Sequence, residues 1–325
     1  MISPAVIIIA LLVFVSLILS FVLGWNNSGL MAGNLSNLVN YRTSLGVTLA
    51  GVFLGLMLEG SKMTHSIVGN LITLQPTNLE LLVGAASSLA LFLPLAVARI
   101  PVSLSNCVVG AFVGVALSDS TSISSRFLTE VVGSWLMAPL VCLLVAVAFY
   151  EVISRAMRST SLTTASWASR MILLGSVFYV AYALGANNGG MIFSFISQST
   201  NPESSTLLLF LVEISIYIAI VLGTTMFGEP IATIVGGKIV QLSGLKTVSA
   251  LLSTAFVAWT FTQFSIPVSL TQMVIGGMVG AGIARGPTIV NRFELFSMVW
   301  HWVLVTVLCT LLGYAIGYSL HIINL

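Results

Sequence analysis

Two asparagine pairs are the first residues in this chain whose type and position could do chemistry. Asn26-Asn27 and Asn187-Asn188 lie 161 positions apart, and a glycine precedes each pair by two positions. Both pairs lie in apolar sequence, where an amide is costly unless it is hydrogen-bonded. Glycine permits a break in a helix, and a broken helix exposes backbone N–H groups that suit an anion. The duplication favours a binding site over asparagines that only join helices.

A second duplicated segment carries hydroxyl and amide side chains. The stretch 100–117 returns as 266–283, with nine of its 18 positions identical. Hydroxyl groups can donate to an oxyanion, although in apolar helices they often bond to their own backbone instead. The repetition again favours a site, whose candidate residues are Ser103, Ser105, Asn106, Ser269, Thr271 and Gln272. Glycines spaced four apart follow in both copies and predict close helix packing rather than ligand contact.

The composition predicts an all-α polytopic membrane protein, since 58% of the 325 residues are hydrophobic and 6% are charged. Soluble domains carry about 25% charged residues. Ten apolar segments are expected, five in each half, at 4–23, 43–60, 78–98, 101–118, 127–150, 168–185, 205–227, 246–265, 267–284 and 295–320. The joints before residues 101 and 267 are too tight for ordinary loops, so one partner of each pair is expected to be re-entrant.

The positive charges predict how the chain is oriented. Nine of its 11 Lys and Arg residues follow odd-numbered segments, which places those loops in the cytoplasm and both termini outside the cell membrane. Because five is an odd number, the second half is inverted relative to the first. We expect a first repeat at 1–150, a cytoplasmic linker at 151–167 and a second repeat at 168–325. Inverted repeats are typical of secondary transporters, whose substrate sites lie near the midplane.

Few ionisable residues lie within the apolar segments. The candidates to carry a coupling proton are Glu59, Glu213, Glu229 and His301, of which Glu59 and Glu229 could equally be interfacial. No Lys or Arg is placed deep in a segment, so an anion is expected to be held by neutral donors and helix ends. The net charge of +2 and the three scattered cysteines give no reason to expect a nucleic-acid partner, a metal site or a cofactor.

The duplicated motifs resemble those of the inorganic phosphate transporter (PiT) family, which includes sulfate permeases. That family carries two copies of Gly-Ala-Asn-Asp-Val-Ala-Asn-Ala and two of Pro-Val-Ser-Thr-Thr-His, the latter before a glycine-rich helix. Here residues 24–27 and 185–188 stand in place of the first motif, and residues 101–106 and 267–272 in place of the second. The resemblance covers nearly the whole chain in the same order. It implies a homodimer in which two repeats form one oxyanion site per chain.

The chain also departs from the family motifs. The family aspartate is replaced by Asn27 and Asn188, and its histidine by Asn106 and Gln272; its later asparagine is replaced by Leu30 and Met191. By resemblance the aspartates help to hold coupling sodium ions. An amide keeps an oxygen ligand but loses the charge that a hard cation prefers. The coupling ion could therefore be H⁺ instead of Na⁺.

The expected function is secondary transport of inorganic phosphate by alternating access. The alternatives are a sulfate or other oxyanion permease, coupled to protons or channel-like, and a membrane scaffold or sensor that transports nothing. An enzyme is not expected, because the sequence contains no convincing pairing of a nucleophile with a base.

Overall fold

The computed structural model describes residues 3–31, 39–100, 102–119, 123–199, 206–238, 244–284 and 292–323, and it is helical almost throughout. In chain order the elements are α1 (Pro4–Met31), α2 (Tyr41–Glu59), η1 (Gly60–Met63), α3 (Asn78–Val97), α4 (Leu104–Ser118), α5 (Ser125–Met157), α6 (Leu162–Leu184), η2 (Gly185–Gly189), α7 (Gly190–Ser199), α8 (Thr206–Lys238), α9 (Gly244–Gln263), α10 (Leu270–Ile283) and α11 (Arg292–Ile323). Eight helical stretches of the described residues are long and apolar enough to cross a membrane. The chain is therefore a multi-pass membrane protein.

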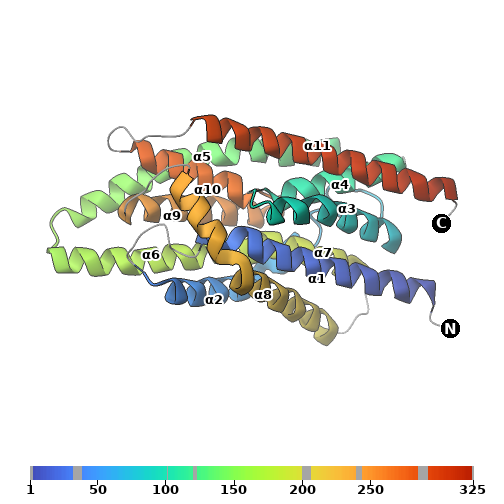
Figure 1. Cartoon of the computed structure of the whole chain (residues 1–325), viewed down its shortest axis with the longest axis horizontal. Helices are drawn as coiled ribbons and strands as arrows, with labels where there is room; N and C mark the ends of the chain where they lie inside the picture. Colours follow the sequence, from blue (N-terminus) through green and yellow to red (C-terminus); the bar gives the residue numbers. More distant parts are fainter. Residues whose placement is uncertain are drawn as a thin grey trace.

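The two halves of the chain repeat one order of elements. The series from α1 to α5 corresponds to the series from α6 to α11, in which η2 and α7 continue α6. The molecule is elongated, and both termini lie at one end of its long axis, which we call the termini end (Figure 1). The sequence prediction of an all-α fold with duplicated halves is confirmed.

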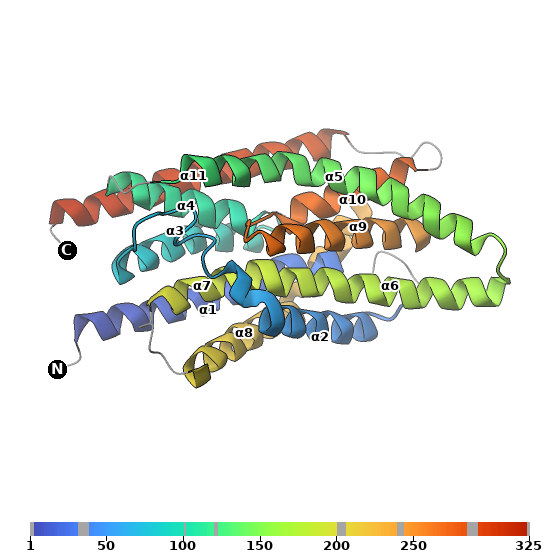
Figure 2. The same cartoon turned by 180° about the vertical axis from the view of Figure 1, so that it is seen from behind.

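Each half contains a helical hairpin that returns to the end from which it entered. Hairpin 1 (α3 and α4) enters from the termini end, and hairpin 2 (α9 and α10) enters from the opposite end (Figures 1 and 2). The second arms have 15 and 14 residues. At about 1.5 Å per residue they measure about 21 to 23 Å, shorter than the hydrocarbon core of about 30 Å. The predicted re-entrant segments are confirmed.

The same unusual backbone turn begins the tip of each hairpin. Arg99 and Ser265 both have φ of 58°, in the left-handed region that residues other than glycine rarely adopt. They lie 166 positions apart, which is also the spacing of the duplicated segments. The duplication therefore extends to the backbone conformation at the two tips. Both tips lie near the middle of the molecule (Figures 1 and 2).

The two repeats interlock instead of packing as separate bodies. α1 packs along α8 and α2 along α6, while the hairpin arms α4 and α10 pack against α11 and α5 of the other repeat. Glycines make these approaches possible. A Cβ at Gly114 would lie 2.1 Å from the carbonyl oxygen of Thr310, and one at Gly280 would lie 2.2 Å from that of Leu143. The spaced glycines thus have the packing role that the sequence predicted.

The connection between the halves is shorter than the linker predicted at 151–167. α5 continues to Met157 and α6 begins at Leu162. α5 runs on because no glycine or proline interrupts residues 140–157. Ser161 caps the next helix, since its hydroxyl oxygen accepts the N–H of Thr164 at 3.3 Å. The boundaries of the two repeats, 1–150 and 168–325, stay a prediction.

Two glycines of α2 should respond to alanine in opposite ways. A Cβ at Gly55 would lie 2.0 Å from the carbonyl oxygen of Tyr182, whereas one at Gly46 would meet nothing within 4 Å. We expect Gly55→Ala to lower the free energy of unfolding by about 1–3 kcal/mol through overpacking. Gly46→Ala should raise it by up to about 1 kcal/mol through helix propensity. Thermal unfolding of the purified variants in detergent measures both, and equal effects would contradict the α2–α6 contact.

Candidate functional site

The two asparagine pairs lie within helical structure rather than at helix ends. Asn187 and Asn188 occupy the π-helical turn η2 between α6 and α7, whereas Asn26 and Asn27 lie within the continuous helix α1. A π turn inserts residues without ending a helix and often occurs at functional sites. The break expected at the glycines therefore takes the form of a π turn in the second repeat and does not occur in the first. The helices that begin at mid-depth are α4 and α10.

Asn187 holds the tip of hairpin 2 with both atoms of its amide. Its Nδ2 donates to the carbonyl oxygen of Ile266 and to the hydroxyl oxygen of Thr262, both at 3.1 Å. Its Oδ1 accepts the N–H of Val268 at 3.2 Å. Asn187 is fully buried. Its amide thus satisfies backbone groups that the turn leaves outside any helix, which matters where no water can do so.

Asn26 makes the related contact in the first repeat, and a residue of the second repeat joins it there. The Nδ2 of Asn26 donates to the carbonyl oxygen of Val102 at 2.8 Å. The hydroxyl oxygen of Thr271, in the first turn of α10, lies 3.5 Å from that same carbonyl oxygen and 3.5 Å from Oδ1 of Asn27. We call Asn26, Asn27, Val102 and Thr271 the central junction. It brings α1, the tip of hairpin 1 and the start of α10 together.

Serine caps the first turn of each short hairpin arm. The hydroxyl oxygen of Ser103 accepts the N–H of Asn106, and that of Ser269 accepts the N–H of Gln272, both at 3.3 Å. The hydroxyl oxygens of Ser103 and Ser105 lie 2.9 Å apart. A helix N-terminus carries a partial positive charge. The tips therefore supply two N-terminal dipoles and several hydroxyl groups at the middle of the molecule.

Asn106 and Gln272 lie on the faces of the hairpins that pack against other helices. Asn106 donates through Nδ2 to the carbonyl oxygen of Trp302 in α11, at 3.4 Å. Gln272 shares a helical face with Gly276, which approaches the backbone of Pro139 in α5. Among the described residues no side-chain hydrogen bond joins either residue to the central junction, although their backbone N–H groups bond to Ser103 and Ser269.

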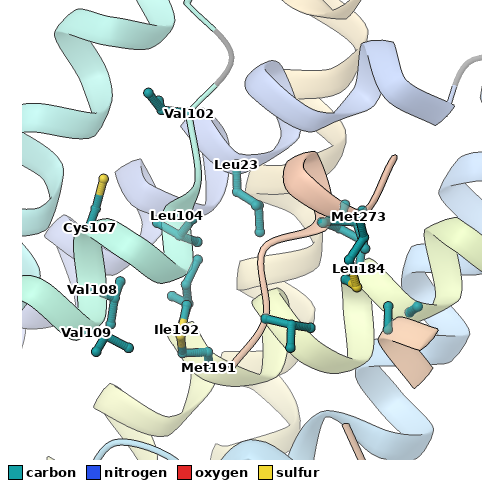
Figure 3. Close-up of a cluster of buried hydrophobic side chains, with 14 of the residues drawn as sticks. Leu23, Val102, Leu104, Cys107, Val108, Val109, Leu184, Met191, Ile192 and Met273 are labelled. Atoms are coloured by element: carbon teal, nitrogen blue, oxygen red, sulfur yellow. The ribbon is translucent and has the colours of Figure 1, made fainter. Parts of the chain in front are cut away.

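All ten candidate residues are buried, with exposed fractions between 0% and 4%. Apolar side chains that neighbour them in sequence form an apolar wall of buried residues (Figure 3), among them Leu23, Leu104, Leu184, Met191 and Met273, each at most 2% exposed. The site is therefore closed to solvent in this conformation. Met191, which replaces a family asparagine, belongs to this apolar wall.

The described ionisable candidates do not contact the central junction. Glu59 pairs with Lys62, with 3.0 Å between Oε1 and Nζ. The Nδ1 of His301 lies 2.6 Å from the carbonyl oxygen of Ser297 in its own helix. Glu213 is partly buried on α8. Glu229 belongs to the same helix, but its side chain lies outside the described residues.

The candidate site is thus polar, buried and uncharged. Within the described ranges no group of three or more His, Cys, Asp or Glu side chains could hold a metal ion. Hydroxyl groups, amides and helix N-termini are suited to binding an oxyanion. A buried polar site between interlocked repeats with opposed hairpins is the architecture of a secondary transporter.

The chain belongs to the phosphate transporter family. The model of that family matches residues 34–177 and again residues 160–313. A protein of Bacillus subtilis named a probable low-affinity inorganic phosphate transporter is 23% identical over 225 residues, covering 67% of each chain. The sulfate permease CysP of the same organism is 25% identical over 263 residues, covering 78% of this chain and 70% of the relative.

A solved structure has the same fold. The chain described as the sodium-dependent phosphate transporter superposes with a TM-score of 0.80 at 19% identity, covering 97% of this chain and 99% of that one. At this identity the likeness concerns the fold.

Sequence reasoning missed the partners of the asparagines, because most of them are backbone groups. The carbonyl oxygens of Val102 and Ile266 have no signature of their own in the sequence. Trp135 could have been found, because it and Trp302 are duplicated 167 positions apart. Its Nε1 donates to the carbonyl oxygen of Pro267 at 3.2 Å, so it also fixes the tip of hairpin 2.

Removing the two motif asparagines should have unequal effects on stability. Asn187→Ala leaves the N–H of Val268 and the carbonyl oxygen of Ile266 unpaired, whereas Asn26→Ala affects the carbonyl oxygen of Val102. Each unpaired buried group costs about 1–3 kcal/mol. Asn187→Ala should therefore lower the melting temperature more than Asn26→Ala does, as measured by thermal unfolding in one detergent. An equal or smaller effect of Asn187→Ala would contradict the two-sided clamp.

Proposed function

We propose that this protein is a secondary transporter that carries inorganic phosphate across the membrane by alternating access between its two hairpin tips. The observation that carries the proposal is the central junction, where both repeats place uncharged hydrogen-bonding groups beside helix N-termini. An anion bound there would be held by dipoles and hydroxyl groups. The closed apolar wall around it corresponds to an occluded state between the two open ones.

The amide of Asn26 favours phosphate over sulfate. Its Nδ2 donates to the Val102 carbonyl, which fixes the orientation of the amide and leaves Oδ1 as an acceptor. That oxygen is buried and has no partner in the described part of the chain. Phosphate near neutral pH can donate a hydrogen bond to such an oxygen, whereas sulfate can only accept one. Sulfate remains the second candidate because a relative is a sulfate permease.

The coupling ion that we propose is the proton. Both positions at which the family carries aspartate hold amides, Asn27 and Asn188, so a sodium ion would lose its charged ligands. The candidate proton carriers remain Glu59, Glu213, Glu229 and His301.

We further propose that the protein lies in the cell membrane as a homodimer, with its termini end outside. The excess of Lys and Arg in the loops at the opposite end supports this orientation. The dimer rests on the family resemblance alone.

Uptake of radiolabelled phosphate and sulfate into liposomes that contain the purified protein tests the proposal. Each anion is offered under a proton gradient, a sodium gradient or neither. We expect phosphate uptake driven by protons and weaker uptake of sulfate. Uptake driven only by sodium would overturn the proposed coupling, and no uptake of either anion would overturn the function.

The hydroxyl groups of Ser105 and Thr271 should matter for affinity and not for folding. The double variant Ser105→Ala/Thr271→Ala should weaken phosphate binding about a hundredfold or more, since each of the two lost hydrogen bonds to a charged group is worth about 1.5–3 kcal/mol. The matched control is Ser215→Ala/Thr225→Ala, because those hydroxyls are exposed and bond to their own helix. Equilibrium dialysis measures both, and equal affinity in the two double variants would count against this site.

A further inference from the structure

Three side chains from both repeats form a closed polar cluster beside the tip of hairpin 2. The Nζ of Lys62, in η1, lies 3.0 Å from Oε1 of Glu59 and also donates to Oε1 of Gln263, at the end of α9. The Nε2 of Gln263 in turn donates to Oε2 of Glu59 at 3.0 Å. Every member bonds to the other two, so moving one requires breaking two contacts. We call Glu59, Lys62 and Gln263 the latch.

The latch and Asn187 hold the same tip from two directions. The hydroxyl of Ser265 donates to the carbonyl oxygen of Lys62 at 2.7 Å. The neighbouring Met63 is fully buried, and its sulfur lies 3.7 Å from Nδ2 of Asn187. Met63 and this tip therefore lie between the candidate site and the latch. The tip of hairpin 1 has no equivalent cluster among the described residues, since Arg99 is exposed and forms no ion pair there.

The latch lies at the depth of the tip of hairpin 2, to which the backbone of Lys62 is bonded through Ser265. Figure 2 shows the short turn that follows α2 midway along the long axis. The segment 64–77 continues from it toward the termini end without regular helix, and His65, Thr73 and Gln75 are exposed along it. A surface hollow of about 280 Å³ adjoins this segment, lined in part by Thr73 and Arg126.

Irregular polar backbone at membrane depth is tolerated where it is buried in protein or lines water. Within this segment His65, Thr73 and Gln75 are exposed, whereas Ser66, Ile67 and Leu71 are buried, and a charged pair facing lipid would be costly. The charge of Lys62 and the 39% exposure of its side chain therefore favour contact with water over contact with lipid at this position.

We propose that Lys62 is a second, peripheral binding site for the oxyanion and that its occupation opens the latch. A phosphate-class dianion arriving from the termini end replaces Glu59 and Gln263 as the partner of Lys62. Gln263 and the tip of hairpin 2 then lose their tie to η1, and the route past Met63 to the buried site opens. The choice of anion rests on the proposed function, whereas the latch itself rests on the contacts.

Accessibility of a cysteine at position 63 tests the latch directly. The background replaces the three buried cysteines, Cys107, Cys142 and Cys309, with alanine, and Met63→Cys is the reporter. A membrane-impermeant maleimide is added to proteoliposomes selected for an outward termini end. In the absence of any anion, we expect the Glu59→Gln and Lys62→Gln variants to be labelled about tenfold faster than the parent. This rate follows if each substitution raises the fraction of molecules with an open latch about tenfold.

Inorganic phosphate is the probe for the binding step. It should speed labelling of the parent and of Lys62→Arg, which keeps the cation, and should not speed labelling of Lys62→Gln further. Arg126→Gln is the matched control, because Arg126 forms a similar ion pair with Glu130 on the same end but 91% of its side chain is exposed. That variant should be labelled like the parent.

The outcomes separate this inference from the proposed function. Parent-like labelling of both Glu59→Gln and Lys62→Gln would overturn the latch, even if the purified parent binds phosphate by equilibrium dialysis. If these variants are labelled faster than the parent, but phosphate neither binds to the parent nor speeds its labelling, the latch stands. Phosphate as the ligand of the latch and the proposed function are then both overturned.

Discussion

Backbone groups at the hairpin tips have to be satisfied without water, and the rest of this structure depends on that constraint. A hairpin that turns inside a membrane exposes carbonyl and N–H groups that no helix can pair. Here the amides of Asn26 and Asn187 bond to those groups. The asparagines can reach the tips because α1 and α6 pack directly against α3 and α9. The placement of the hairpins, and of the helix N-termini that begin at their tips, follows from these few hydrogen bonds.

The uncharged character of the site has a physical consequence for selectivity. In the site that we propose no fixed cation lies beside the anion, which would be held by hydroxyl groups, amides and helix dipoles, and these are short-ranged and directional. Such a site distinguishes ligands by where their donors and acceptors lie. An amide whose orientation is fixed by a backbone carbonyl contributes an acceptor that cannot turn into a donor, so the protonation state of the oxyanion becomes part of its recognition.

The two hairpin tips are built alike and held differently. Their turns begin at residues with the same φ, and their short arms are capped by equivalent serines. The tip of hairpin 2 is nevertheless held by Asn187, Trp135 and the latch, whereas Asn26 holds the tip of hairpin 1 through one carbonyl oxygen. A perfect repeat would open equally in both directions. These unequal contacts mean that the two ends of the transporter need not open with equal ease.

The sequence by itself determined the membrane class, the duplication, the re-entrant arms and the family motifs. Each of these depends on composition, spacing or local chemistry, which can be read along the chain. Only the tertiary structure decided which polar residues meet. It put the side chain of Asn106 against α11, because the face of a helix that packs is set by its neighbours. It also assembled the latch from residues about 200 positions apart, since contacts between repeats depend on how helices from both halves interlock.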